Sequence, residues 1–158
     1  MRQTSGFLSA VPVGTWGLGL GSARLELATH VFGTTVHVVF DQVHGLVNVG
    51  AEPLDSSISM TVQAARLNSG NRRRDNHLRS HMGLDVRRFP VIVFTGSADA
   101  LTDGGTLLVA GELAIRGRLV PLTLPVDVRN VDDCRTALLA RGEITVSALG
   151  IGLAVPIG

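Results

Sequence analysis

The chain has 158 residues and a formal net charge of +1, from 14 basic and 13 acidic side chains. This near balance excludes a strong overall field, so we expect no nucleic-acid partner. Its 45% hydrophobic and 17% charged residues are typical of a folded chain, which we expect to be one domain over residues 1–158. The single cysteine, Cys134, excludes an intrachain disulfide. The sequence has neither a signal peptide's apolar run nor the ~20 apolar residues of a membrane span, so we expect a cytoplasmic protein without stable membrane insertion.

Alternation of apolar and polar residues recurs along the chain and predicts β-strands. In chain order the expected strands cover 24–29, 35–40, 43–49, 57–64, 91–96, 107–116, 122–128 and 144–148. Within 57–64, apolar side chains at even positions alternate with polar ones at odd positions. The Asp103-Gly104-Gly105 and Arg116-Gly117-Arg118 segments have the composition of hairpin turns. About eight short strands with tight connections predict an all-β sandwich or barrel.

Residues 69–90 interrupt this pattern and hold six of the 14 arginines. Asn68 or Ser69 is a suitable N-cap for a short helix that runs to about Ser80, and Gly83 is a suitable terminator. We therefore predict a short helical cap segment on the β-structure.

The cap segment resembles the YceI-like family, the lipid- or polyisoprenoid-binding proteins of bacteria. Four blocks carry the resemblance with matching spacing: Arg74-Asp75-Asn76-His77-Leu78, Ser80, Leu84-Asp85-Val86 and Phe89-Pro90. Ile92 and Phe94 then stand in its apolar-any-Phe strand, and residues 109–128 are similar to its Gly-any-Leu-Thr-Ile-Arg-Gly hairpin. His30 and Gly45 match an early histidine and a strand-internal glycine. The chain departs from the family pattern at Met82-Gly83 and at Ser147.

The resemblance implies a closed antiparallel lipocalin-like β-barrel with an apolar cavity for a polyprenyl chain. Five Phe, one Trp and no Tyr against 19 Gly also favour a cavity over a filled interior. We expect an amphiphilic lipid with a long isoprenoid tail, such as a polyprenyl diphosphate or a prenylated quinone, and no other cofactor. A homodimer is a further expectation from the family. The predicted ligand-binding residues are His30, Phe40, Ile58, Met60, Val62, Arg74, Asp75, His77, Met82, Ile92, Phe94, Leu113, Ile115, Leu122 and Leu124.

Several polar residues admit two interpretations. Arg74 and Asp75 either meet a polar head group or pin the cap, and we favour the second role. His77 and His81 have helical metal-ligand spacing but lack a third ligand, so we predict no metal site. Gly83 stands where the family carries a bulky aromatic residue, and we expect it to enlarge the space near the cap.

No pattern of residues indicates catalysis. Cys134 follows two aspartates, which disfavour a thiolate, and the chain contains no Gly-any-Ser-any-Gly elbow. We predict that the chain is not an enzyme. The alternative hypotheses are a non-carrier interaction module, with a filled barrel and an Arg-rich docking segment, and an enzyme acting on a hydrophobic substrate.

Overall fold

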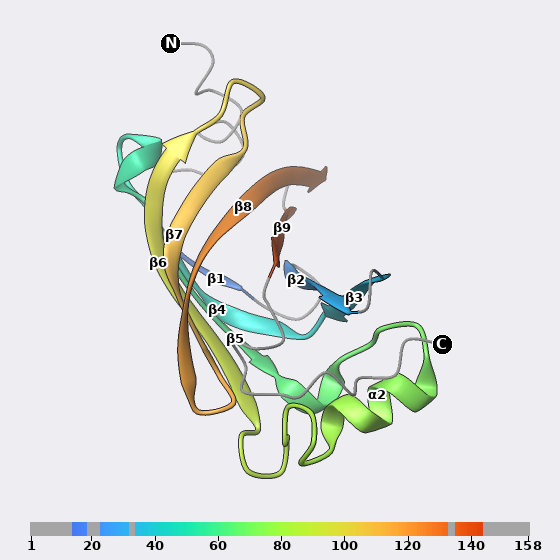
Figure 1. Cartoon of the computed structure of the whole chain (residues 1–158). Helices are drawn as coiled ribbons and strands as arrows, with labels where there is room; N and C mark the ends of the chain where they lie inside the picture. The colour runs from blue at the N-terminus through green and yellow to red at the C-terminus, as the bar shows by residue number, and fades with distance from the viewer. Residues whose placement is uncertain (1–13, 19–22, 32–33, 133–134, 144–158) are drawn as a thin grey trace.

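The computed structural model describes residues 14–18, 23–31, 34–132 and 135–143 (Figure 1). The described residues form one α-helix, two short 3-10 helices and a nine-stranded sheet. The strands are β1 (Gly14–Leu18), β2 (Ala23–Val31), β3 (Thr34–Phe40), β4 (Val43–Val49), β5 (Ser57–Gln63), β6 (Val91–Leu101), β7 (Leu107–Ile115), β8 (Arg118–Asp132) and β9 (Arg135–Glu143). The helices are η2 (Pro53–Asp55), η3 (Ala64–Arg66) and α2 (Arg72–Arg79). The prediction of a mostly-β chain with one short helical segment is confirmed.

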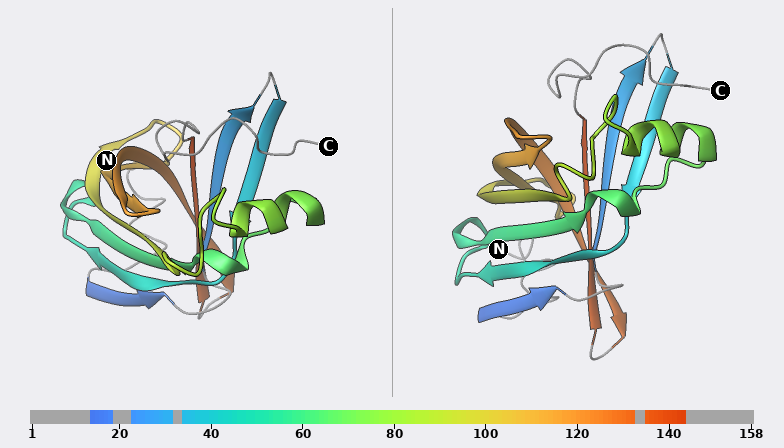
Figure 2. Two further views of the ribbon diagram at one scale, coloured as in Figure 1. Left: turned by 60° about the horizontal axis from the view of Figure 1, so that its bottom comes forward. Right: turned by 90° about the horizontal axis from the view of Figure 1, so that it is seen from below.

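The strands are arranged in the order β1-β4-β5-β6-β7-β8-β9-β2-β3, and the sheet curls strongly around its own inner face (Figure 2). In the described part of the chain, β1 and β3 are the two ends of this order, so closure of the barrel stays a prediction. Neighbouring strands are antiparallel except β2 and β9, which run parallel with Glu26 opposite Arg141. The Arg141 Nε lies 3.3 Å from the Glu26 Oε1.

The expectation of a wholly antiparallel sheet is therefore wrong for β2 and β9. Alternation identifies a strand, but it carries no information about which distant strand will lie beside it. The two partners are separated by most of the chain, so no tight hairpin turn forces them to run in opposite directions.

The side chains of the inner face form one apolar core. In β5, Ile58, Met60 and Val62 are buried, and the intervening residues are partly or fully exposed, which confirms the predicted alternation. Buried positions on the other strands join the same core, and Leu67, Leu78 and Leu84 of the η3–α2 region complete it.

The two predicted hairpin turns are also confirmed. Residues 102–106 connect β6 to β7, and Arg116 and Gly117 connect β7 to β8. Arg116 and Gly117 both have positive φ values, 50° and 71°, as a two-residue hairpin turn requires. Strands β1 and β9 were not predicted, and the expected strand at 144–148 lies outside the described residues.

Two facing glycines allow β6 and β7 to approach closely. Gly96 lies directly opposite Gly111. A Cβ atom on Gly111 would lie 2.0 Å from the Thr95 carbonyl oxygen, and one on Gly96 would lie 2.7 Å from the Ala110 carbonyl oxygen. Only glycine fits at these two positions without movement of the backbone.

Candidate functional site

Most of the predicted ligand-binding residues lie together in the apolar interior. Nine of them are buried members of one core: Phe40, Ile58, Met60, Val62, Ile92, Phe94, Leu113, Ile115 and Leu124. Leu122 is partly buried and packs against that core. They come from β3, β5, β6, β7 and β8, so strands that are distant in the sequence contribute to one continuous apolar wall.

The interior side chains pack tightly against one another. Phe94, Leu113 and Leu124 expose 0–1% of their surface, and Ile58 exposes 7%. The expected open cavity is therefore not found between these side chains, and an apolar guest must separate or displace them to enter.

Two predicted residues lie apart from this group. Met82 is 54% exposed, so the structure places it on the surface rather than in the core. His30 lies on β2 opposite Thr35 of β3, and its side chain is outside the described residues.

Helix α2 begins at a different residue from the one predicted. Asn71 is the N-cap, and its side-chain oxygen accepts a hydrogen bond from the Arg74 N–H at 3.0 Å. Asn68 instead forms a backbone bridge to Val39 of β3, with N···O distances of 2.9 and 3.0 Å. This bridge joins the segment before the helix to the end strand of the sheet.

Arg74 and Asp75 both contact Ser69. The Asp75 carboxylate accepts from the Ser69 backbone N–H at 2.8 Å and from its hydroxyl. The Arg74 Nε donates to the Ser69 hydroxyl at 2.9 Å, and its Nη2 donates to the Ser69 carbonyl at 2.8 Å. Through these hydrogen bonds, Arg74 and Asp75 hold the start of the cap segment in place.

Arg79 fastens the other end of the helix to η3. Its Nε donates to the Ala65 carbonyl at 2.8 Å and its Nη2 donates to the Leu67 carbonyl at 3.2 Å. Leu78, which directly precedes Arg79 in the chain, is buried in the core. The helix therefore has an apolar side that covers the interior and a polar side that is fixed to the chain around it.

The two cap histidines do not share a helical face. Helix α2 ends at Arg79, so His81 lies beyond it in a turn. The His77 carbonyl accepts a hydrogen bond from the Ser80 hydroxyl at 2.6 Å, and that contact helps to end the helix. Among the described residues, no group of three or more His, Cys, Asp or Glu side chains is placed to hold a metal ion.

The expectation that Gly83 enlarges a ligand site is wrong. Gly83 is buried against the end of α2, and a Cβ atom there would lie 2.5 Å from the Leu78 carbonyl oxygen and 2.6 Å from the His77 carbonyl oxygen. The missing side chain lets the chain turn back tightly onto the helix, so this glycine has a packing role.

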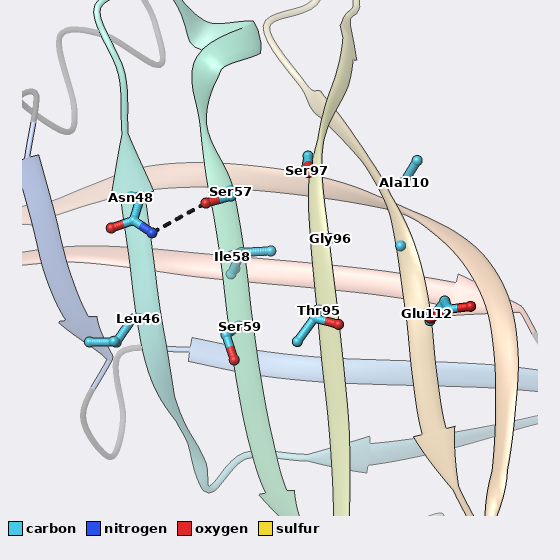
Figure 3. Close-up of a pocket in the computed structure, with 11 residues that line it drawn as sticks. Leu46, Asn48, Ser57, Ile58, Ser59, Thr95, Gly96, Ser97, Ala110 and Glu112 are labelled. Carbon is cyan, nitrogen blue, oxygen red and sulfur yellow. Dashed lines mark hydrogen bonds between the residues drawn. The ribbon is translucent and has the colours of Figure 1, made fainter.

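A shallow depression of about 490 Å³ lies on the opposite, outer face of β4–β7 (Figure 3). Its lining is mostly small and hydroxyl-bearing: Leu46, Asn48, Ser57, Ile58, Ser59, Thr95, Gly96, Ser97, Ala110, Gly111 and Glu112. The Asn48 amide donates to the Ser57 hydroxyl at 3.3 Å and accepts from the Thr15 hydroxyl at 2.8 Å. Sequence reasoning missed this depression, although the outward serines of β5 were its visible signal.

The curled sheet, its apolar interior and the helix over that interior define an all-β domain with a helical cap. The chain belongs to the YceI-like family, because the model of the YceI-like domain matches residues 20–157.

Two relatives support the assignment. A UPF0312 protein of Enterobacter sp. (strain 638) is 33% identical over 72 residues, which are 46% of this chain and 37% of that protein. The protein YceI of Salmonella newport is 30% identical over 104 residues, which are 63% of this chain and 54% of that protein. The chain thus spans about half or less of the length of the curated relatives it matches.

Solved structures show the same fold. Burkholderia cenocepacia BcnA has a TM-score of 0.64 and 22% identity, with 82% of this chain and 79% of that chain covered. A polyisoprenoid binding domain from Saccharophagus degradans, implicated in plant cell wall breakdown, has a TM-score of 0.50 and 14% identity, with 76% and 70% covered. Within the described residues, none of the helices has the length and apolar character needed to cross a bilayer.

Proposed function

We propose that this protein binds and carries, or stores, an amphiphilic isoprenoid lipid, with the tail between the inner faces of the curled sheet. The observation that supports this most is the continuous apolar wall contributed by five strands. At roughly 25 cal/mol per Å² of apolar surface, burial of about 400 Å² of tail supplies about 10 kcal/mol before the costs of binding. A polyprenyl diphosphate or a prenylated quinone fits this description.

In this proposal the 69–90 segment gates the interior. Leu78 and Leu84 close the core from the side of the cap, and hydrogen bonds from Arg79 to the Ala65 and Leu67 carbonyls and from Arg116 to the His81 carbonyl fasten that segment. Outward movement of the segment opens a path between the walls, and the tail then replaces contacts that the side chains make with one another. In this proposal the barrel closes around the tail at β1 and β3, the two ends of the strand order. The likeness to a polyisoprenoid binding domain supports the choice of ligand class.

The direct test is to extract the purified protein with organic solvent and to analyse the extract by mass spectrometry. We expect an isoprenoid lipid in stoichiometric amount, or saturable uptake of a long-chain isoprenoid by the extracted protein. A clean extract together with no uptake contradicts the proposal. The same preparation, run on a calibrated size-exclusion column, tests the expected homodimer, and cell fractionation tests the proposed cytoplasmic location.

A further inference from the structure

Two ends of the molecule carry clusters of opposite charge, although the net charge is only +1. One end, at the bottom of Figure 1, joins residues 69–90 to the β7–β8 turn. The Arg116 Nη2 donates to the His81 carbonyl at 2.9 Å, and the Phe89 ring lies 2.9 Å from where a Cβ atom of Gly117 would be. These contacts make the cap segment and the turn one surface.

This surface, which we call the basic end, comprises residues 69–91 and 115–119. It carries eight arginines against two aspartates, which leaves six positive charges. The arginines are Arg72, Arg73, Arg74, Arg79, Arg87, Arg88, Arg116 and Arg118, and the acids are Asp75 and Asp85. The net charge gives no sign of this field, and the topology adds Arg116 and Arg118 to the six arginines of residues 69–90.

The acidic end lies at the far end of β6. Residues 50–57 and 97–106 are joined there by a hydrogen bond from the Ala98 N–H to the Ser56 carbonyl at 2.8 Å. These two segments hold Glu52, Asp55, Asp99 and Asp103 and no basic residue. Strand β6 runs from one end to the other, a separation of roughly 30 Å at the rise of an extended strand.

The basic end also exposes large apolar side chains. Leu119 is 66% exposed, Met82 is 54% exposed and Val91 is 41% exposed. Leu119 of β8, Ala114 of β7 and Val93 of β6 lie in register on neighbouring strands. Val91 lies on the same outward face of β6 as Val93. Met82 directly follows His81, whose carbonyl holds Arg116. Aliphatic side chains therefore stand among the cations, with no covering element in the described residues.

We propose that the basic end docks reversibly on an anionic phospholipid surface. The exposed arginines of this surface bind lipid phosphates, and Leu119, Met82 and Val91 enter the head-group region, a combination that holds peripheral proteins at membranes. Repulsion of the acidic end orients the molecule so that the cap meets the bilayer. A nucleic acid offers phosphates but no apolar layer for these side chains, so a membrane is the better match. The inference rests on the proposed function, since it places lipid loading at the gated end.

The test uses the full chain and cosedimentation with vesicles of phosphatidylcholine, with or without phosphatidylglycerol. We expect binding to the anionic vesicles only, and weaker binding as salt is raised. Leu119→Ser should weaken the partition about tenfold. The double variant Arg87→Gln with Arg118→Gln should weaken it about tenfold or more. All three positions are exposed, so circular dichroism should show an unchanged fold.

Two matched controls lie away from the basic end. Leu54→Ser, at a 51% exposed position in η2, and Arg24→Gln, at an exposed position on β2, should bind vesicles as the wild type does. The proposal is overturned if the wild-type protein does not sediment with anionic vesicles, or if the basic-end variants sediment as well as the controls.

The isoprenoid content of each protein, measured in the absence of vesicles, distinguishes this inference from the proposed function. Loss of vesicle binding by a variant that still contains isoprenoid supports docking by the basic end. Vesicle binding by a wild-type protein that never contains isoprenoid also supports docking, and it refutes the carrier function instead.

Discussion

The carboxylate of Asp75 accepts hydrogen bonds from both the backbone N–H and the hydroxyl of Ser69, six residues earlier in the chain. Asp75 is 8% exposed, so these partners replace the water that the carboxylate has lost. We expect Asp75→Ala to lower the free energy of unfolding by about 2–3 kcal/mol, because two donors of Ser69 lose a charged acceptor. Urea unfolding followed by circular dichroism measures this loss. Asp99→Ala, at an exposed position on β6, should change it by less than about 0.5 kcal/mol. Equal losses for the two variants would argue against a holding role for Asp75.

A second prediction concerns the close approach of β6 and β7. Gly111→Ala places a methyl group 2.0 Å from the Thr95 carbonyl oxygen, so the strands must separate. We expect a loss of about 3 kcal/mol in the free energy of unfolding. Gly104→Ala, in the β6–β7 turn, is the matched control, because its nearest neighbour would lie 4.0 Å away. Thermal unfolding should show a lowered melting temperature for the first variant and little change for the second.

The third prediction tests the gate. Arg79→Gln removes the guanidinium that donates to the Ala65 and Leu67 carbonyls, and we expect a modest loss of stability, about 1–2 kcal/mol. Because the cap is then less firmly fastened, release of a bound fluorescent isoprenoid should become faster. Arg73→Gln changes an exposed arginine of the same helix and should leave the release rate unaltered. An unchanged rate in Arg79→Gln, measured by stopped-flow fluorescence, would place the entry path elsewhere.

A fourth prediction distinguishes the two faces of β8. Leu122 packs against the core, whereas its neighbour Thr123 is exposed on the outer face. Leu122→Trp adds bulk where the tail is proposed to lie and should reduce isoprenoid binding tenfold or more, whereas Thr123→Trp should leave it unchanged. Equilibrium titration of the extracted protein provides the comparison. Equal affinities would mean that the ligand does not use this wall.

Much of the fold was predictable because it depends on local patterns. The alternation of β5 matches its burial position by position, and the Arg116–Gly117 turn has the positive φ values that its composition indicates. The Arg74-Asp75 block was correctly expected to lie in a cap. In each case neighbouring residues alone determine the outcome.

The features that were missed depend on distant partners. Strand β9 is rich in Ala, Leu and Arg residues, which also suit a helix, and it is a strand because β8 and β2 lie on either side of it. The role of Gly83 was misjudged because the backbone of α2, rather than a ligand, occupies the space beside it. Six arginines of the basic end were visible as the Arg-rich segment 69–90, but Arg116 and Arg118 join them only when the β7–β8 turn meets the cap.

The parallel pairing of β2 with β9 ties an early part of the chain to a late one. On the ribosome, β2 has only β3 beside it until β9 has been synthesised, so one edge of that hairpin stays without its permanent neighbour. Forming the pair closes a very long loop, an entropic cost that slows folding. The two parts of the sheet can therefore join only after β9 has been synthesised, and until then the nascent chain displays an unsatisfied strand to its surroundings.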